Sequence, residues 1–139
     1  MTVETPATLL LDTDTLSAVM RGNRVAESKA RDYLVARGRF CFSIITRYEI
    51  LRGLKAKQAA RQIAFVERLC ARSDVLTLTD ASIVRAAELY AELRARGALI
   101  GDADILIAAT ALVRGAGVVT NNQGHFNRID GLYVENWLR

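Results

Sequence analysis

Acidic side chains follow or precede apolar segments at several points of this chain. Asp12 and Asp14 come directly after the apolar run Thr8–Leu11, and Asp104 directly precedes the longest apolar run. Carboxylates that are brought together raise one another's pKa and repel. If they meet in the fold, a cation must lie among them. Mg²⁺ is a suitable one, since proteins hold it with one or two carboxylates, water and phosphate oxygens.

The stretch from Ile100 to Val113 is apolar on almost every face, which predicts a buried helix. Asp102 is a candidate N-cap, whose side chain would accept a backbone N–H. Asp104 lies in the first turn, where the helix dipole favours a negative charge. An unpaired charge at the edge of a core is costly, so Asp104 requires a partner elsewhere in the chain. Capping alone remains the alternative explanation for Asp102.

Glu49 follows a second apolar segment, Phe40–Ile45, whose aromatic and β-branched residues favour a strand. Thr46 and Glu49 have the T-x-x-E spacing of a capping box, which offers Glu49 a purely structural role. However, Glu49 also lies just beyond the end of an expected strand, as Asp12 does. Both interpretations stay open from the sequence.

The charge balance makes nucleic acid a candidate partner. Nineteen basic and fifteen acidic residues give a net charge of +4, and only Lys29, Lys55 and Lys57 are lysines. The planar guanidinium of arginine suits bidentate contact with phosphate. A solvated arginine-rich surface is the alternative explanation for the same composition.

Composition also excludes several classes of protein. No stretch reaches the ~18 uninterrupted apolar residues of a membrane span, and the first residues lack the pattern of a signal peptide. Cys41 and Cys70 both lie in apolar segments, which argues against a disulfide scaffold. We therefore expect a cytoplasmic protein with reduced thiols and no membrane association.

Short apolar segments alternate with helical patterns along the whole chain. The expected strands are residues 8–11, 40–45, 74–78, 117–120 and, at an edge, 132–137. The expected helices are residues 15–20, 25–36, 46–53, 59–70, 81–96 and 102–113. Asp80 is the expected cap of the helix 81–96, whose expected inward face is Ile83, Ala86, Ala87, Tyr90 and Leu93. This alternation is typical of an α/β fold with three layers and a mostly parallel sheet, and 139 residues suit one domain spanning residues 1–139.

A parallel sheet brings the carboxyl ends of its strands to one edge, where ligands bind. The polar residues that fall at such ends, or at the helix starts that follow, are Asp12, Asp14, Glu49, Asp104 and Asn122. Two divalent ions ~4 Å apart at this edge would clamp the attacking and leaving oxygens of a phosphodiester. A zinc site is disfavoured, because His125 is the only histidine and no close cysteine pair exists. We expect His125 to be a surface or packing residue.

Four motifs in order resemble those of the PIN-domain family and, within it, the VapC-type toxins of bacterial toxin–antitoxin pairs. They are LLDTDTLS, SIITRYEILRG, IGDADILIAATAL, and VVTNNQGHF followed by GLYVENW. The resemblance implies a PIN-like three-layer α/β/α fold. It also implies an endoribonuclease that depends on Mg²⁺ or Mn²⁺ and cleaves an RNA substrate. Such toxins are often homodimers and are silenced by a cognate antitoxin protein.

The resemblance also assigns roles to individual residues. It implies that Asp12, Glu49 and Asp104 hold the metal, directly or through water, and that Asn122 completes the catalytic set. The family often has Asp where this chain has Asn122, so a second metal would be held only weakly. The family usually has Asn where this chain has Asp14.

Further residues are expected around these ligands. Thr120, Asp14 and Asp102 are expected to support the site, and Arg47 and Arg52 are expected to position the RNA backbone.

Two other functions remain open from the sequence. LLLDTDTL also resembles the first motif of haloacid-dehalogenase-type phosphatases, although a Gly-Thr continuation is missing and no lysine follows Lys57. The second alternative is a catalytically silent PIN-like module that binds RNA or a protein partner. The sequence does not specify which RNA would be cut, since specific recognition mostly uses exposed loop bases.

Overall fold

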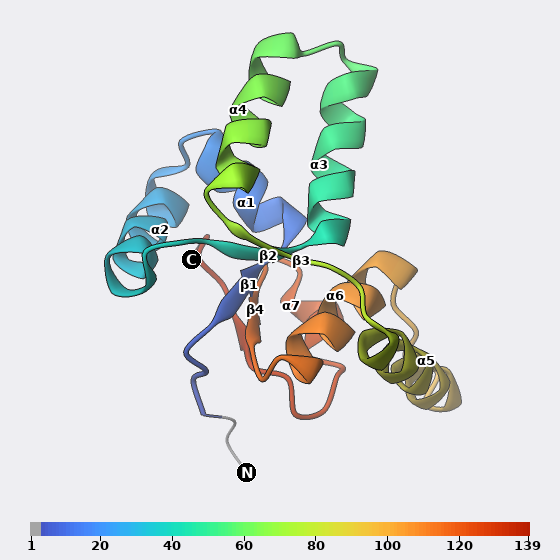
Figure 1. Cartoon of the computed structure of the whole chain (residues 1–139). Coiled ribbons are helices and arrows are strands. Elements are labelled where there is room, and N and C mark those ends of the chain that lie inside the picture. Colours follow the sequence, from blue (N-terminus) through green and yellow to red (C-terminus); the bar gives the residue numbers. More distant parts are fainter. Residues whose placement is uncertain (1–3) are drawn as a thin grey trace.

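A parallel five-stranded sheet forms the centre of the computed structural model, which describes residues 4–139. The first three residues of the expected domain 1–139 lie outside the described residues. The strand order is β3-β2-β1-β4-β5, and every pairing is parallel (Figure 1). The strands are β1 Leu9–Leu11, β2 Cys41–Ser43, β3 Asp74–Leu76, β4 Gly117–Val119 and β5 Val134–Glu135. The predicted α/β class with a parallel sheet and a last edge strand is confirmed.

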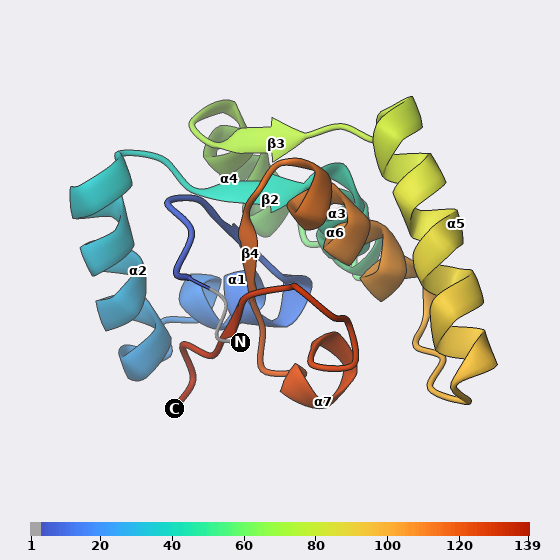
Figure 2. The ribbon, with the colours of Figure 1, turned by 90° about the horizontal axis from the view of Figure 1, so that it is seen from below.

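Helices cover both faces of this sheet. They are α1 Thr13–Met20, α2 Arg24–Arg37, α3 Ile44–Ala56, α4 Ala60–Ala71, α5 Asp80–Ala95, α6 Asp102–Val113 and α7 Gln123–Phe126. Helices α1 to α4 lie on one side, and α5 to α7 lie on the other (Figure 1). The view from below shows α6 in front of the sheet, α5 to its right and α4 behind it (Figure 2). The three predicted layers are therefore present.

The central strand β1 supplies apolar side chains to both layers. Successive side chains on a strand point to opposite faces. Accordingly, Leu10 packs into a core with Ile107 of α6, whereas Leu9 and Leu11 pack with Phe42 into a second core beside α1 and α3. Because both faces are covered, the strand reads as a continuous apolar run instead of an alternating one.

Helix α6 is the buried helix that its sequence predicts, but its cap differs from the prediction. Ile107, Ala108 and Ala109 are fully buried between α5 and the sheet. The N-cap is Gly101, and Asp102 is the first helical residue, exposed to solvent. The predicted capping role of Asp102 is therefore wrong, because the extended backbone that precedes the helix ends one residue earlier.

Helix α3 begins earlier than predicted, directly at the end of β2. The Ser43 side chain caps it by accepting the N–H of Ile45 at 3.0 Å. Thr46 lies inside the helix, so the T-x-x-E pattern does not form a capping box. This leaves the Glu49 carboxylate free of the structural role that the sequence offered it.

Helix α5 also differs from the prediction in its cap and in its buried face. Thr79 caps it in a capping box with Ser82, and Asp80 is the first helical residue. Ile83 and Tyr90, which were expected to face inward, are 46 % and 41 % exposed. Ala86 and Leu93 are buried as predicted, and Ser82 and Leu89 are buried with them. The exposed residues and the buried residues both recur at helical spacing, so the spacing alone does not say which face is buried. Packing against α6 decides it.

Among residues 4–139, no helix combines the length and hydropathy that crossing a bilayer requires.

Gly117 in β4 provides a test of this packing. A Cβ at this position would lie 2.7 Å from the Tyr133 ring and 2.9 Å from a methyl group of Leu9. Because packed side chains close the space, we expect Gly117→Ala to lower the free energy of unfolding by about 1–3 kcal/mol in urea titrations.

Gly53 inside α3 is the matched control, because a Cβ there meets nothing within 4 Å. Gly53→Ala is expected to raise stability by about 0.5–1 kcal/mol through helix propensity. Equal effects of the two substitutions would contradict the assigned packing of β4.

Candidate active site

Asp12 is the most deeply placed acid of the predicted set. It follows β1, caps α1 and is only 6 % exposed. Its Oδ2 accepts a hydrogen bond from the Thr120 hydroxyl at 2.8 Å, and its Oδ1 accepts the Thr13 N–H at 2.8 Å. Thr120 follows β4, the neighbour of β1 in the sheet. The sheet therefore joins residues 108 positions apart in sequence.

Electrostatics at Asp12 favour a bound cation. Burial, and after it the charge of Asp14, raise the pKa of Asp12 to about 7, although the hydrogen bonds from Thr120 and Thr13 oppose the shift. The charge of Asp104 also raises this pKa. Asp104 thus acts on Asp12 through space, as predicted for acids gathered at one edge of the sheet. An added cation would stabilise the ionised form of Asp12.

His125 provides the partner that Asp104 requires. Its Nδ1 lies 3.0 Å from Oδ2 of Asp104 and 2.8 Å from the amide nitrogen of Asn122. One nitrogen makes both contacts, so it donates to the Asp104 carboxylate when it carries a proton and accepts from the Asn122 amide when it does not. His125, expected as a surface or packing residue and not as a metal ligand, has a side chain that is 40% exposed, and it packs against these two residues. Its spacing of three from Asn122, one helical turn, was the available sequence signal.

Glu49 is connected to the same edge through Thr13. The Thr13 hydroxyl donates to Oε1 of Glu49 at 2.6 Å, and Oε2 lies 3.7 Å from the guanidinium of Arg52. Thr13 is the residue after Asp12, so this hydrogen bond fixes the Glu49 side chain beside the end of β1. Sequence analysis missed Thr13, because nothing local marks a hydroxyl in a first helical turn as an orienting group.

The supporting residues separate into two groups. The Asp14 carboxylate accepts the Asn121 N–H at 3.1 Å, and the Thr120 hydroxyl accepts the Asn122 N–H at 2.9 Å. These two contacts hold the loop after β4 in place. Asp102 is exposed, and the hydrogen bonds and ion pairs found within residues 4–139 do not include its side chain.

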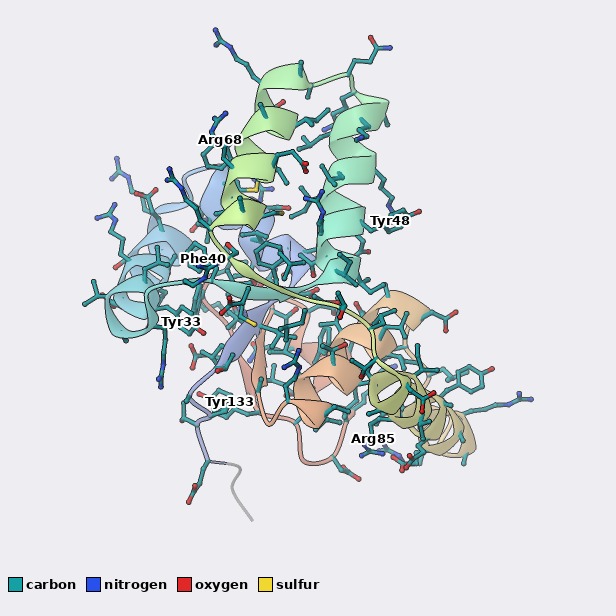
Figure 3. The ribbon with its side chains drawn as sticks, viewed as in Figure 1. Tyr33, Phe40, Tyr48, Arg68, Arg85 and Tyr133 are labelled. Atoms are coloured by element: carbon teal, nitrogen blue, oxygen red, sulfur yellow. The ribbon has the colours of Figure 1, made fainter. Side chains whose placement is uncertain are left out.

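Arg47 and Arg52 were expected to contact RNA, and both have partners within the chain. Arg47 binds Glu67 at 2.7 Å, and this contact raises the pKa of Arg47. It ties α3 to α4. Arg52 lies near Glu49 and stacks over the Tyr48 ring, 5.2 Å from its centroid. Figure 3 shows Tyr48 on the outer side of α3.

The carboxylate oxygens of the candidate site fit a hard divalent ion, although they do not form a complete coordination shell. Within residues 4–139, no three His, Cys, Asp or Glu side chains are close enough to form a metal cluster. Mg²⁺ needs only one or two carboxylates, because water and substrate phosphates complete its shell. Asp12 and Asp104 provide hard oxygen ligands, and burial together with the charges of Asp14 and Asp104 raises the pKa of Asp12.

The raised pKa of Asp12 predicts a pH-dependent stability. The folded state binds the proton more tightly than the unfolded state, whose pKa is near 3.8. The contribution is therefore fully present below pH ~4 and lost as pH rises through ~7, by up to about 4 kcal/mol in the metal-free protein.

Urea unfolding in a chelator at several pH values measures this dependence. Asp12→Asn should flatten it, whereas Asp130→Asn, which changes an exposed carboxylate in the loop before β5, should leave it in place. Parallel curves for wild type and Asp12→Asn would contradict the assignment.

Comparisons with known proteins identify the family. The PIN domain family model matches residues 9–132. The tRNA(fMet)-specific endonuclease VapC of Shigella flexneri is 33% identical over 129 residues, covering 92% of this chain and 96% of that protein. Ribonuclease VapC2 of Haemophilus influenzae is 36% identical over 102 residues, covering 73% of this chain and 77% of that protein.

Solved structures agree with the sequence matches. DNA-bound VapBC from Salmonella typhimurium matches with a TM-score of 0.82 at 30% identity, covering 94% of this chain and 98% of that chain. VapBC2 from Rickettsia felis, bound to a promoter DNA fragment, matches with a TM-score of 0.82 at 25% identity and the same coverage. The PIN match includes the motif around Asp12, which excludes the phosphatase alternative. This chain belongs to the PIN-domain family, in its VapC group.

Proposed function

We propose that this protein is a VapC-type toxin, an endoribonuclease that depends on Mg²⁺ or Mn²⁺ and is inhibited by a cognate antitoxin. The observation that carries the proposal is the buried Asp12 carboxylate, which is bonded to Thr120 and lies within the field of Asp14 and Asp104. Relatives in the VapC group are named as ribonucleases, and similar structures are VapBC assemblies. We place the activity in the cytoplasm, where the RNA substrate lies.

The proposed mechanism divides the work among the acids and their partners. Asp12 and Asp104 would hold the ion directly, and Glu49 would hold it through water. When bound, the ion lowers the pKa of a water molecule and neutralises charge on the phosphate under attack. Thr120 orients Asp12, and Thr13 orients Glu49.

His125 and Asn122 complete the proposed site. The His125 ring holds the Asp104 carboxylate in place, as partners of metal ligands commonly do. The Asn122 amide lies against the same ring and offers a neutral oxygen at the edge of the site. A neutral group at this position favours one firmly held ion over two.

Substitution of Asp104 tests this assignment. Asp104→Asn keeps the size of the side chain and removes the charge, so we expect RNA cleavage in Mg²⁺ to fall by more than about 100-fold. Circular dichroism and thermal unfolding should show that the fold is retained. The comparison variant is Asp102→Asn, which changes an exposed acid on the same helix.

The outcomes separate the two remaining functions. Full cleavage by Asp104→Asn would refute the mechanism. Wild-type protein that binds RNA without cutting it, equally in Mg²⁺, Mn²⁺ or a chelator, would instead favour the silent RNA-binding module.

We also propose that the protein is a homodimer that pairs through α5. Its outer face carries exposed Ile83, Val84 and Tyr90 around the small Ala87. A two-fold axis at Ala87 would set Val84 of one copy opposite Tyr90 of the other. Such self-complementarity is what an isologous interface requires.

Ala87→Arg should disrupt this dimer, because two like charges would meet at the axis. We expect sedimentation velocity to show a dimer for wild type and a monomer for Ala87→Arg. Ala64→Arg, at an exposed position of α4, is the matched control and should remain dimeric. A dimeric Ala87→Arg variant would place the interface elsewhere.

A further inference from the structure

A cavity of about 500 Å³ lies between α1, α3 and α4, beside the candidate active site. This size falls within the range of about 300–1,000 Å³ that is common for ligand sites. Thr13 and Glu49, which are hydrogen-bonded to each other, form part of its wall. A group bound in the cavity would therefore lie next to the reacting phosphate of a bound substrate.

Three cations surround this cavity without a carboxylate partner. Arg21 follows α1, Lys57 follows α3, and Arg61 lies in the first turn of α4. The ion pairs found within residues 4–139 engage Arg47 and Arg52 but none of these three. The only acid in the cavity wall is Glu49. The cavity is therefore suited to an anionic ligand.

The rest of the wall suits a flat aromatic group. Phe65 of α4 contributes its ring to the cavity and is 47 % exposed. Met20 and Leu54 add apolar surface, and Gln62 and Ser17 add hydrogen-bonding groups. An aromatic side chain in a cationic groove is the usual platform for a base of single-stranded RNA, because every base has a π-face that can stack.

We propose that this cavity is a nucleotide pocket, which holds one unpaired nucleotide of the RNA next to the phosphodiester that is cut. The base stacks on Phe65, and flanking phosphates lie against Lys57 and Arg61. This inference rests on the proposed function and deepens it. A segment of the antitoxin is the rival occupant. RNA is favoured because the cavity that these cations line also includes Thr13 and Glu49 of the candidate active site.

Two pairs of variants separate the ring and the charges from structural effects. Phe65→Leu removes stacking but keeps apolar contact, and Phe65→Tyr keeps the ring. The double variant Lys57→Gln/Arg61→Gln removes two pocket cations. Arg68→Gln is the matched charge control, because Arg68 lies on the side of α4 that faces away from α3 (Figure 3).

The probe is a short fluorescent single-stranded RNA of mixed sequence, assayed for cleavage in Mg²⁺ and for binding by anisotropy. Phe65→Leu should raise KM and the dissociation constant about tenfold and leave kcat within about twofold, whereas Phe65→Tyr should behave as wild type. In the double variant, the slope of log affinity against log salt should decrease by about 1.4, which corresponds to two lost phosphate contacts. Arg68→Gln should leave both quantities unchanged.

Two results would contradict the assignment of the cavity as a nucleotide pocket and leave the proposed function unaffected. In the first, the wild type cleaves RNA, but the pocket variants have the same KM and the same slope of log affinity against log salt as Arg68→Gln. In the second, Phe65→Leu binds RNA with unchanged affinity but is no longer inhibited by the antitoxin. This result would assign the cavity to the protein partner. Conversely, a wild type that binds the probe through the pocket without cleaving it would refute the proposed function alone.

Discussion

The burial of one carboxylate governs the arrangement of this molecule. Asp12 ends the central strand at a point where side chains of both layers exclude water, and its pKa rises to about 7 as a result. A charge held there costs free energy unless it is matched. The hydroxyl of Thr120 and the backbone of Thr13 match it only in part. The proposed divalent ion would offset the remaining cost of this charge and would itself attract a phosphate.

The parallel sheet explains how acidic residues that are far apart in sequence come together at this site. β1 lies between β2 and β4, so the segments after all three strands reach one edge. Asp12, Glu49 and Asn122 come from these segments, and α6 delivers Asp104 to the same place. Each acid is oriented by a neighbour from a different element, as in the contacts of Thr13 with Glu49 and of His125 with Asp104. The site therefore depends on the whole sheet.

Some of the basic side chains form ion pairs within the chain, and others remain available to bind a ligand. Arg47 pairs with Glu67 and ties α3 to α4, whereas Arg52 pairs with Glu49 within α3. Arg21, Lys57 and Arg61 surround the cavity beside Glu49 and have no carboxylate partner in the described part of the chain. A net charge of +4 alone cannot separate these groups, because pairing depends on which helices pack together.

The sequence by itself determined the α/β class, the five strand positions and the acids at their ends, because apolar runs and helical spacing are local properties. It also indicated the family, which the PIN match over residues 9–132 confirms. Only the tertiary structure decided that His125 meets Asp104, that Thr13 meets Glu49, and that α5 buries Leu89 in place of Tyr90. The caps at Ser43, Thr79 and Gly101 were likewise decided by where each strand or loop delivers the chain. Such contacts join segments that are distant in sequence, so no local pattern can encode them.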